Sequence, residues 1–510
     1  MREDSTRAEG SIVLASGPSA SIAPGGPGSG TAHAGTARAG GDLLARLPPF
    51  AARWRLPRSQ LVLGPLAGRI ALGGLALGGL ALVAFATAAP SPLVPRSYLG
   101  FAHWESGPLH LLLGHLSADP TTLNLSLSAL LVAMTAAYGA ALLAVRTLSM
   151  RTIVIFVVAV HAILLMSPPL QLTDLFNYLG YARLGGLHHV NPYTHGIASE
   201  LHDPVYRYTT WHHLRSPYGP LFTALSYPLA WLPLPVAYWV LKVVTVLASL
   251  GFVALVYRCA RLLGRDPRFA VVFVAANPVF LLFGITGFHN DFFMLVPSTA
   301  AIALLLARRD RAAGAVLMLA IAVKFTAVLL LPFLLIAARP SARRLRLLAG
   351  AALAAIPLVA LSVALFGLTI PNLSDQSTLL TGFSIPNLAG LALGIGGGAP
   401  GLLRVANVAL VLSVIYLLRR RGDWLSGAGW ATLALIASLA WLVPWYVIWL
   451  LPLAALSTSL RLRRATLAFT VFLVFAFMPA TGIILSAQGI NPMGTSVGQA
   501  SISLQHKLER

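Results

Sequence analysis

The chain has 510 residues, of which 57% are hydrophobic and 10% charged, and its formal net charge at pH 7 is +21. Such a chain has too little polar surface to cover a water-soluble domain, so we expect a membrane protein that crosses the bilayer many times. The single cysteine, Cys259, excludes an intramolecular disulfide framework and a cysteine-based metal cluster.

Residues 1–60 are rich in Gly, Ser, Ala and Pro without an apolar period, which predicts a disordered cytoplasmic tail. Apolar runs, each long enough to cross the bilayer as a helix, then recur through a transmembrane domain at 61–485. Residues 486–510 are predicted as a C-terminal tail on the outer face. The predicted fold class is all-α, a polytopic transmembrane bundle of about 11–13 spans with an active site built from outer-face loops. The predicted spans are residues 68–90, 125–147, 152–170, 236–258, 269–286, 292–307, 347–367, 401–418, 427–442, 445–459 and 465–485.

Two apolar segments do not fit a single crossing. Residues 217–235 are rich in proline and are predicted to lie on the outer leaflet or dip into it. Residues 312–338 are flanked by arginines that both favour the cytoplasm, so we expect two short helices or a hairpin with Lys324 near the middle. Broken helices at membrane depth are tolerated only where they line a cavity in the protein.

The positive charge gathers at the ends of apolar runs, as the positive-inside rule expects. We interpret it as topology, with anionic membrane lipid as the partner and no nucleic acid. The resulting arrangement is a multi-pass protein of the bacterial plasma membrane with a cytoplasmic N-terminus. Seven carboxylates of the membrane region and most of the histidines then fall on the outer face, where ATP and nucleotide-sugars are absent. The arginine clusters lie at residues 46–69, 146–151, 258–268, 308–311, 339–346, 419–421 and 461–464.

The stretch from Ser167 to Tyr193 is the most informative, because an apolar run ends at a proline pair and an acid, Asp174, follows within a few residues. On a helix, Tyr178 lies one turn after Asp174, on the same face. A second polar group, His289-Asn290-Asp291, is wedged between two apolar runs with almost no loop. Polar groups at such a boundary are costly unless they are satisfied or used.

Five motifs in this order resemble a known family. They are SPPLQLTDLFNYLGYARLGGLHHVNPY at 167–193, SPYGPLF at 216–222, NPVFLLFGITGFHNDFFM at 277–294, AVKFTAVLLLPF at 322–333 and PWYVIWLLP at 444–452. Residues 150–455 resemble the polyprenyl-phosphomannose-dependent mannosyltransferases of actinobacteria. This group includes α-1,6-mannosyltransferases and glycosyltransferase family 87 of the C superfamily of integral-membrane glycosyltransferases. The chain departs from the family pattern at His188-His189 and at Phe288, positions that bear on the acceptor and the sugar.

The resemblance implies inverting transfer of a hexose, with mannose the favoured assignment, from a polyprenyl-phosphate donor to a lipid-linked or cell-envelope glycan on the outer face. Such a transfer needs a carboxylate that takes the acceptor proton, and Asp174 matches the family's base. The alternative for Asp174 is a helix N-cap. His289, Arg183 and Lys324 are candidates for holding the phosphate. Arg183 could instead anchor at the interface, and Lys324 could snorkel.

Further candidates line the expected sugar pocket, and each has a structural alternative. Asn290 and Asp291 could form only a tight turn, or a histidine and an acid could ligate a metal, although no third ligand at a defined spacing supports one. The remaining substrate-binding candidates are Tyr178, Asn191, Tyr193, Tyr218, Trp445 and Tyr446. The Asn191-Pro192-Tyr193 segment is also typical of a plain turn, and the aromatic pair is typical of an interfacial belt.

Two other classes of function stay open. A polytopic transporter or glycolipid flippase also has many spans and intramembrane charges, but it places its polar groups near the midplane and shows internal repeats. A non-catalytic partner in an envelope complex would be favoured only if Asp174 were dispensable. The sequence indicates no cofactor, and a divalent metal is not indicated.

Overall fold

The computed structural model describes residues 62–88, 91–94, 102, 104, 105, 107–109, 119–171, 173–420 and 422–509. The predicted tail at 1–60 and most of residues 95–118 lie outside the described residues. Within the described ranges all regular structure is helical and there is no strand, which confirms the all-α class.

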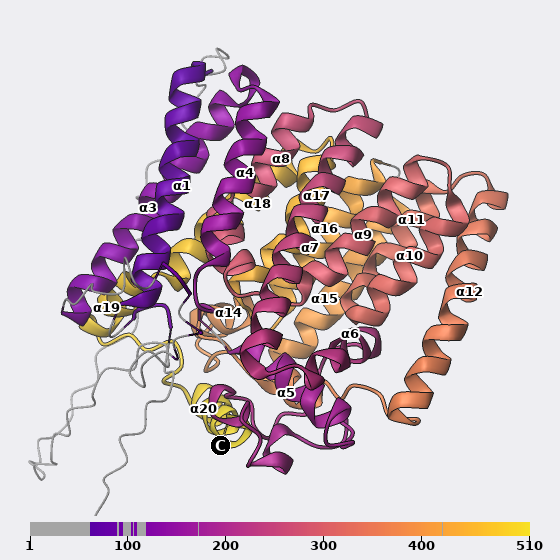
Figure 1. Cartoon of the computed structure of the whole chain (residues 1–510). Helices are drawn as coiled ribbons and strands as arrows, with labels where there is room; N and C mark the ends of the chain where they lie inside the picture. Colours follow the sequence, from indigo (N-terminus) through magenta and orange to yellow (C-terminus); the bar gives the residue numbers. More distant parts are fainter. Residues whose placement is uncertain are drawn as a thin grey trace, which may run out of the picture.

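The helices follow one another along the chain (Figure 1), and a long loop at residues 187–219 separates α5 from α6. The first are α1 Pro65–Thr87, α3 Pro120–Ala144, α4 Met150–Leu165, α5 Asp174–Gly186, α6 Pro220–Ser226, α7 Leu234–Leu262, α8 Pro267–Ala275, α9 Asp291–Leu306, α10 Asp310–Val323 and α11 Leu331–Ala337. The rest are α12 Ser341–Phe366, α13 Ser374–Thr378, α14 Ile385–Ala392, α15 Pro400–Arg419, α16 Trp424–Ser438, α17 Val447–Leu456, α18 Leu460–Phe477, α19 Pro479–Ala487 and α20 Ser496–Glu509. Short 3₁₀ turns are η2 Val145–Thr147, η3 Ile197–Glu200, η4 Tyr206–Tyr208, η5 Tyr227–Trp231, η7 Phe325–Leu330 and η8 Pro444–Tyr446, and η6 Phe280–Ile285 is a π-helix.

Five helices of the described chain are long and apolar enough to cross a membrane: α1, α3 with η2, α7, α12 and α15. The bent pair α18 and α19 raises the number to six if it forms one span. This is fewer full-length helices than the 11–13 spans expected from the sequence. Five further apolar segments of 10–17 residues coincide with predicted spans or with the predicted break at 312–338.

The difference arises because several apolar runs are broken by prolines and polar residues and are buried inside the protein. The predicted span at 269–286, for example, is divided at Asn277-Pro278 into α8 and the π-helix η6. Every residue of α17 is buried. A hydropathy pattern cannot distinguish such an internal helix from a lipid-facing one, whereas only the latter must match the bilayer thickness.

Neither of the two segments predicted not to cross the membrane singly forms one long helix. Residues 217–235 contain only α6 and η5, together 12 residues, before α7 begins. In the segment 312–338, α10 ends at Val323, Lys324 adopts an extended backbone, and η7 and α11 follow. The break places Lys324 where two helical pieces meet.

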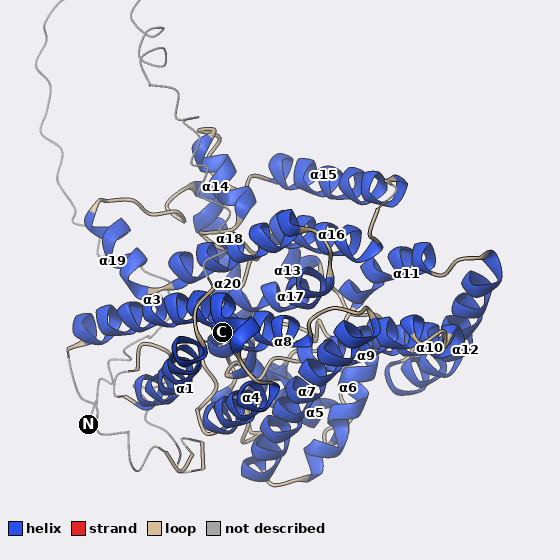
Figure 2. Ribbon diagram, turned by 90° about the horizontal axis from the view of Figure 1, so that it is seen from above, coloured by secondary structure: helices blue, strands red, loops and turns tan. Residues whose placement is uncertain are grey.

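Two long helices lie at the edges of the bundle and face outward. Figure 2 shows α15 at one edge beside α16, and α12 at another beside α10. None of the apolar window of α15 is buried, and 17% of that of α12 is. Their exposed Leu, Ile and Val side chains are suited to contact with lipid. The chain is therefore a membrane protein.

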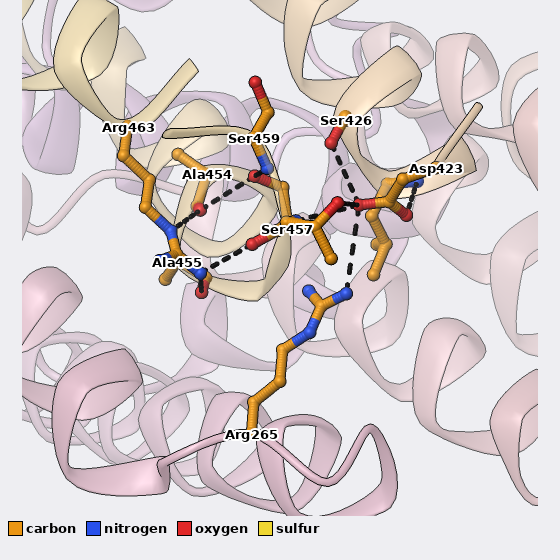
Figure 3. Close-up of polar contacts among 10 residues, drawn as sticks. Arg265, Asp423, Ser426, Ala454, Ala455, Ser457, Ser459 and Arg463 are labelled. Atoms are coloured by element: carbon orange, nitrogen blue, oxygen red, sulfur yellow. Dashed lines mark hydrogen bonds and ion pairs between the residues drawn. The ribbon is translucent and has the colours of Figure 1, made fainter. Parts of the chain in front are cut away.

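The two ends of the bundle differ in chemistry. Figure 1 shows α5 and α20 at one end and α8 at the other. At the α8 end, Asp423 caps α16 and lies 3.8 Å from Arg265, while Arg463 donates a 2.6 Å hydrogen bond to the Ser457 carbonyl (Figure 3). The Arg265–Asp423 contact joins the loops before α8 and α16, and a hydrogen bond from the Thr458 N–H to Asp423 adds the loop before α18 at this arginine-rich end. The α5 end contains the acids and histidines described next.

Candidate active site

Asp174 is the first residue of α5, and its carboxylate faces a histidine from a distant part of the chain. Its Oδ2 lies 3.2 Å from Nδ1 of His289, which is an ion-pair distance, although the angle is outside hydrogen-bond geometry. The N-cap position of α5 belongs to Thr173, which makes no side-chain capping bond. The structure therefore does not support the alternative that Asp174 serves as the cap.

The turn that presents His289 has an unusual backbone. The π-helix η6 ends just before it, and Phe288 has a φ of 49°, in the left-handed region that side chains rarely adopt. Such geometry is concentrated at functional sites. The His289 ring stacks on Trp445, with centroids 3.8 Å apart. The backbone N–H of Asn290 donates a 3.1 Å hydrogen bond to the Tyr178 hydroxyl, which ties this turn to α5.

Asp291 and Lys324 form a second charged pair beside the first. Lys324 Nζ lies 2.8 Å from Asp291 Oδ1, and the Trp449 indole N–H donates to the same oxygen. Lys324 also lies over the rings of Tyr446 and Trp449. Lys324 therefore does not snorkel away from the protein, because it has an anion and two aromatic faces within reach.

The motif at 216–222 holds the lysine segment in place. The Gly219 N–H donates a 3.0 Å hydrogen bond to the Val323 carbonyl. A Cβ at Gly219 would lie 2.2 Å from the Ala322 carbonyl oxygen, so only glycine permits this approach. Tyr218 packs edge-on against Tyr178, with ring centroids 4.8 Å apart.

Most of these groups line one cavity of about 310 Å³. Helices α5 and α9, and η8 with α17 after it, all begin at or near its wall, and helix N-termini favour negative charge. The predicted residues on the wall are Asp174, Tyr178, Tyr218, Asn290, Asp291, Lys324, Trp445 and Tyr446. His289 is not itself on the wall but contacts it through Asp174 and Trp445.

Arg183 is the predicted phosphate ligand that the structure places elsewhere. Its Nε donates to both carboxylate oxygens of Asp203, at 2.8 and 2.9 Å, and His188 Nε2 lies 2.7 Å from the same carboxylate. Burial alone would raise the pKa of the Asp203 carboxyl, but the hydrogen bonds from Arg183 and His188 outweigh burial and lower that pKa. The Arg183 guanidinium is thus committed to a buried pair outside the cavity.

Asn191 and Tyr193 also lie outside the cavity wall and hold loops together. The Asn191 amide donates to the Phe366 carbonyl at 2.8 Å, and its oxygen accepts from the Tyr193 N–H at 2.9 Å. The Tyr193 hydroxyl donates to the Tyr218 carbonyl at 2.9 Å. These bonds favour the alternative that the segment Asn191-Pro192-Tyr193 is a structural turn. The turn supports the cavity indirectly, because Tyr193 is bonded to Tyr218, which lies on the wall.

Several cavity residues were not among the predicted ones. Asn177 and Tyr181 lie three and seven residues after Asp174, so helical spacing from the acid could have identified both. No signal in the sequence pointed to the others, because they come from loops and helices far along the chain. These are Trp211, Gln376, Asn407, Ser438 and Trp441. Among the described residues, no group of three His, Cys, Asp or Glu side chains is placed to hold a metal ion.

The amino-acid sequence matches two known protein families. The family described as Alpha-(1->6)-mannopyranosyltransferase, N-terminal domain, matches residues 77–340, just over half of the chain. The chain belongs to this mannopyranosyltransferase family. Glycosyltransferase family 87 matches residues 217–480. Asp174 lies in the first match, Trp445 in the second, and the turn at His289 and Lys324 in both. The resemblance found in the five motifs is confirmed.

Two curated members of the mannopyranosyltransferase family are similar to this chain. Alpha-(1->6)-mannopyranosyltransferase A of Mycobacterium tuberculosis (strain ATCC 25618 / H37Rv) is 28% identical over 358 residues, covering 60% of this chain and 64% of the relative. The protein of the same name from Corynebacterium glutamicum (strain ATCC 13032) is 28% identical over 179 residues, covering 33% and 35%. The matches thus span less than two thirds of either relative. No solved structure matches the chain significantly.

Proposed function

We propose that this chain is an inverting glycosyltransferase that takes a hexose, with mannose the favoured assignment, from a polyprenyl-phosphate donor and transfers it to a lipid-linked or cell-envelope glycan. The observation that carries this proposal is the cavity in which the Asp174 carboxylate and the Lys324 ammonium lie on one wall. One group can accept a proton and the other can hold a phosphate. The family match supports mannose as the sugar.

Asp174 acts as the general base in this proposal. Its carboxylate takes the proton of the acceptor hydroxyl while that oxygen attacks C1 of the hexose. The bond between C1 and the phosphate oxygen breaks, and its electron pair leaves with the polyprenyl phosphate. One displacement inverts the anomeric centre. A retaining reaction needs a second carboxylate as nucleophile, whereas the neighbouring Asp291 carboxylate is held by Lys324 and Trp449.

The leaving phosphate is stabilised by positive groups at the cavity. Lys324 supplies nitrogen donors at the wall, and the helix N-termini there add favourable dipoles. Asp291 orients Lys324 but does not occupy all of its hydrogen-bond donors, since the ammonium carries three N–H groups. The charge that develops on the departing oxygen is thus met by groups that the fold already holds in position.

An apolar cavity supports a lipid as the donor's carrier. It is lined by side chains of α9, η7, α16 and α17 and shares Thr326 and Trp449 with the polar cavity. Its other lining residues include Leu295, Ile302 and Leu330. An isoprenoid chain has the chemistry that such a surface accepts. The donor's phosphate would then lie at Lys324, where the polar and apolar cavities meet.

The orientation in the membrane follows from the two ends of the bundle. The arginine-rich end, with Arg265 and Arg463, is assigned to the cytoplasm by the positive-inside rule. The Asp174 cavity then opens toward the outer face of a bacterial plasma membrane. Nucleotide-sugars are absent there, which agrees with a lipid-bound donor.

Membranes that contain the chain, and matched membranes that lack it, test the proposal. They are given synthetic polyprenyl-phosphomannose with labelled mannose, or labelled GDP-mannose, and incorporation into extractable lipid and glycan is measured. We expect incorporation from the polyprenyl donor only where the chain is present. No incorporation from the polyprenyl donor, nor from its glucose or arabinose analogues, would remove the transferase assignment and favour a transporter. Incorporation from GDP-mannose alone, with polyprenyl-phosphate synthesis blocked, would reject the lipid donor.

A further inference from the structure

Two buried carboxamides in the cavity lack the partners that buried amides normally have. Asn177 is 0% exposed and Asn290 is 1% exposed. Neither Nδ2 nor Oδ1 of Asn177 has a hydrogen-bond partner among the described residues, and Nδ2 of Asn290 has none either. Both side chains lie on the wall of the cavity that holds Asp174.

Other fully buried asparagines of the described chain are satisfied. Asn277 donates to Thr470 and accepts from the Val279 N–H. Asn387 donates to the carbonyls of Gly382 and Pro492 and accepts from the Gly398 N–H. An unpaired buried amide opposes folding, so the fold gains nothing from the unpaired state of Asn177. A ligand that enters the cavity is the natural partner.

The position of Asn177 relates it to the reacting groups. It follows Asp174 by three residues on α5, so the two side chains share a face of the helix within one turn. Asn290 stands between His289 and Asp291, and its backbone N–H is fixed to the Tyr178 hydroxyl. The two amides therefore come from the two segments that supply Asp174 and His289.

The chemistry of an amide selects the kind of ligand. Both polar atoms of Asn177 are unpaired within the described part of the chain, so the side chain presents an NH2 donor and an acceptor oxygen whichever way the amide is turned. An ionised phosphate only accepts hydrogen bonds, and an isoprenoid chain does neither. A sugar hydroxyl both donates and accepts. The unpaired acceptor thus points to the hexose rather than to the rest of the donor.

We propose that Asn177, with Asn290, binds hydroxyl groups of the transferred hexose and sets the choice between hexoses. This inference rests on the proposed transferase function and adds the residues that recognise the sugar. A neutral amide forms these bonds without adding a charge that would perturb the base. A site that must bond a hydroxyl in one position discriminates strongly against a sugar that lacks it there.

The test compares wild type, Asn177→Leu and, as a matched control, Asn124→Leu on α3. The polyprenyl-phosphate donors carry mannose or its C2 epimer glucose, and kcat/KM is measured for each at equal protein level. We expect Asn177→Leu to lower kcat/KM for the preferred donor by about tenfold or more, since about 1.4 kcal/mol corresponds to a factor of ten. The ratio of kcat/KM for the two donors should move toward one in Asn177→Leu, whereas Asn124→Leu should match wild type in both values.

A binding measurement separates sugar recognition from a structural role. Inhibition by polyprenyl phosphate, which has no sugar, should be unchanged in Asn177→Leu. The proposal is overturned if the hexose preference stays as in wild type, or if inhibition by the sugar-free lipid weakens as much as donor use does. If wild type transfers neither hexose and its binding of the donor is no tighter than that of the sugar-free lipid, the proposed function and this inference both fall. Transfer by wild type with an unchanged preference in the variant rejects this inference alone.

Discussion

At the residue scale, the Lys324 ammonium is held by one carboxylate and two aromatic rings. Its Nζ lies 2.8 Å from Asp291, whose side chain is 1% exposed. A buried carboxylate that loses its cation is left with an uncompensated charge. The pair therefore fixes both side chains, and it keeps the ammonium at the cavity wall, where a phosphate can reach it.

Replacement of this lysine tests the phosphate role. Lys324→Met should lower kcat/KM for the lipid donor by roughly 10- to 150-fold, because hydrogen bonds to charged groups contribute about 1.5–3 kcal/mol. Lys324→Arg keeps the charge and should recover part of the loss. Steady-state kinetics with purified protein measure both. Equal activity of the methionine variant and wild type would show that the phosphate is held elsewhere.

The backbone at Gly287 gives a second test at this scale. A Cβ there would lie 2.1 Å from His289 Nε2 and 2.8 Å from the Phe283 carbonyl oxygen. Gly287→Ala should therefore displace the His289 ring and lower transfer by about 100-fold, as small misplacements at active sites do. Gly251→Ala in α7 is the control, since a Cβ there meets nothing within 4 Å. Activity near wild type in Gly287→Ala would mean that the ring position is unimportant.

At the element scale, the loop after α5 is held by a buried network at Asp203. Its carboxylate takes hydrogen bonds from Arg183, His188 and the Val205 N–H. The network joins the end of α5 to the loop at 200–205 and so supports the helix that carries Asp174. Its contribution should depend on pH in a direction set by the lowered pKa of Asp203.

A carboxyl with a lowered folded-state pKa contributes stability that is fully present above its unfolded value, 3.8, and is lost as the pH falls through the folded value. The free energy of unfolding should thus be lower in Asp203→Asn than in wild type by on the order of 3 kcal/mol, and this difference should be constant from pH 5 to 8. It should shrink below about pH 4. Melting curves in detergent measure it. A difference that disappears already at pH 6 would contradict the assignment to this carboxylate.

The sequence predicted the parts of the site that follow local rules. Asp174 at a helix start, the polar turn at His289 and the break at Lys324 all stand out against apolar surroundings. The pairing of Arg183 with Asp203 could not be predicted in this way, because Asp203 lies 20 residues away in an irregular loop. A pairing of that kind depends on how the loop folds back, which has no periodic signature.

At the scale of the whole molecule, the apolar helices could be predicted from the sequence, but whether each helix faces lipid or protein could not. The long helices such as α7 and α12 were predicted close to their observed bounds. Some short helices predicted as spans are buried in the protein, because apolar residues look alike whether they face lipid or protein. α17, buried along its whole length, is the clearest case.

The two-ended arrangement predicts a topology that labelling can measure. In a Cys259→Ala background, a single cysteine introduced by Ser199→Cys lies at the cavity end, and one introduced by Gly422→Cys lies at the arginine-rich end. Both positions are exposed. A membrane-impermeant maleimide should label the first in intact cells and the second only after permeabilisation. The reverse pattern would place the cavity in the cytoplasm.

The most direct test of the central claim is transfer by Asp174→Asn. Labelled mannose from polyprenyl-phosphomannose is followed in membranes with matched protein levels, and Asp119→Asn, at the cap of α3, serves as the control. Loss of a general base should lower the rate by about 100- to 10,000-fold in Asp174→Asn, while the control keeps the wild-type rate. Transfer by Asp174→Asn within a few-fold of wild type would contradict the assignment of this carboxylate as the base.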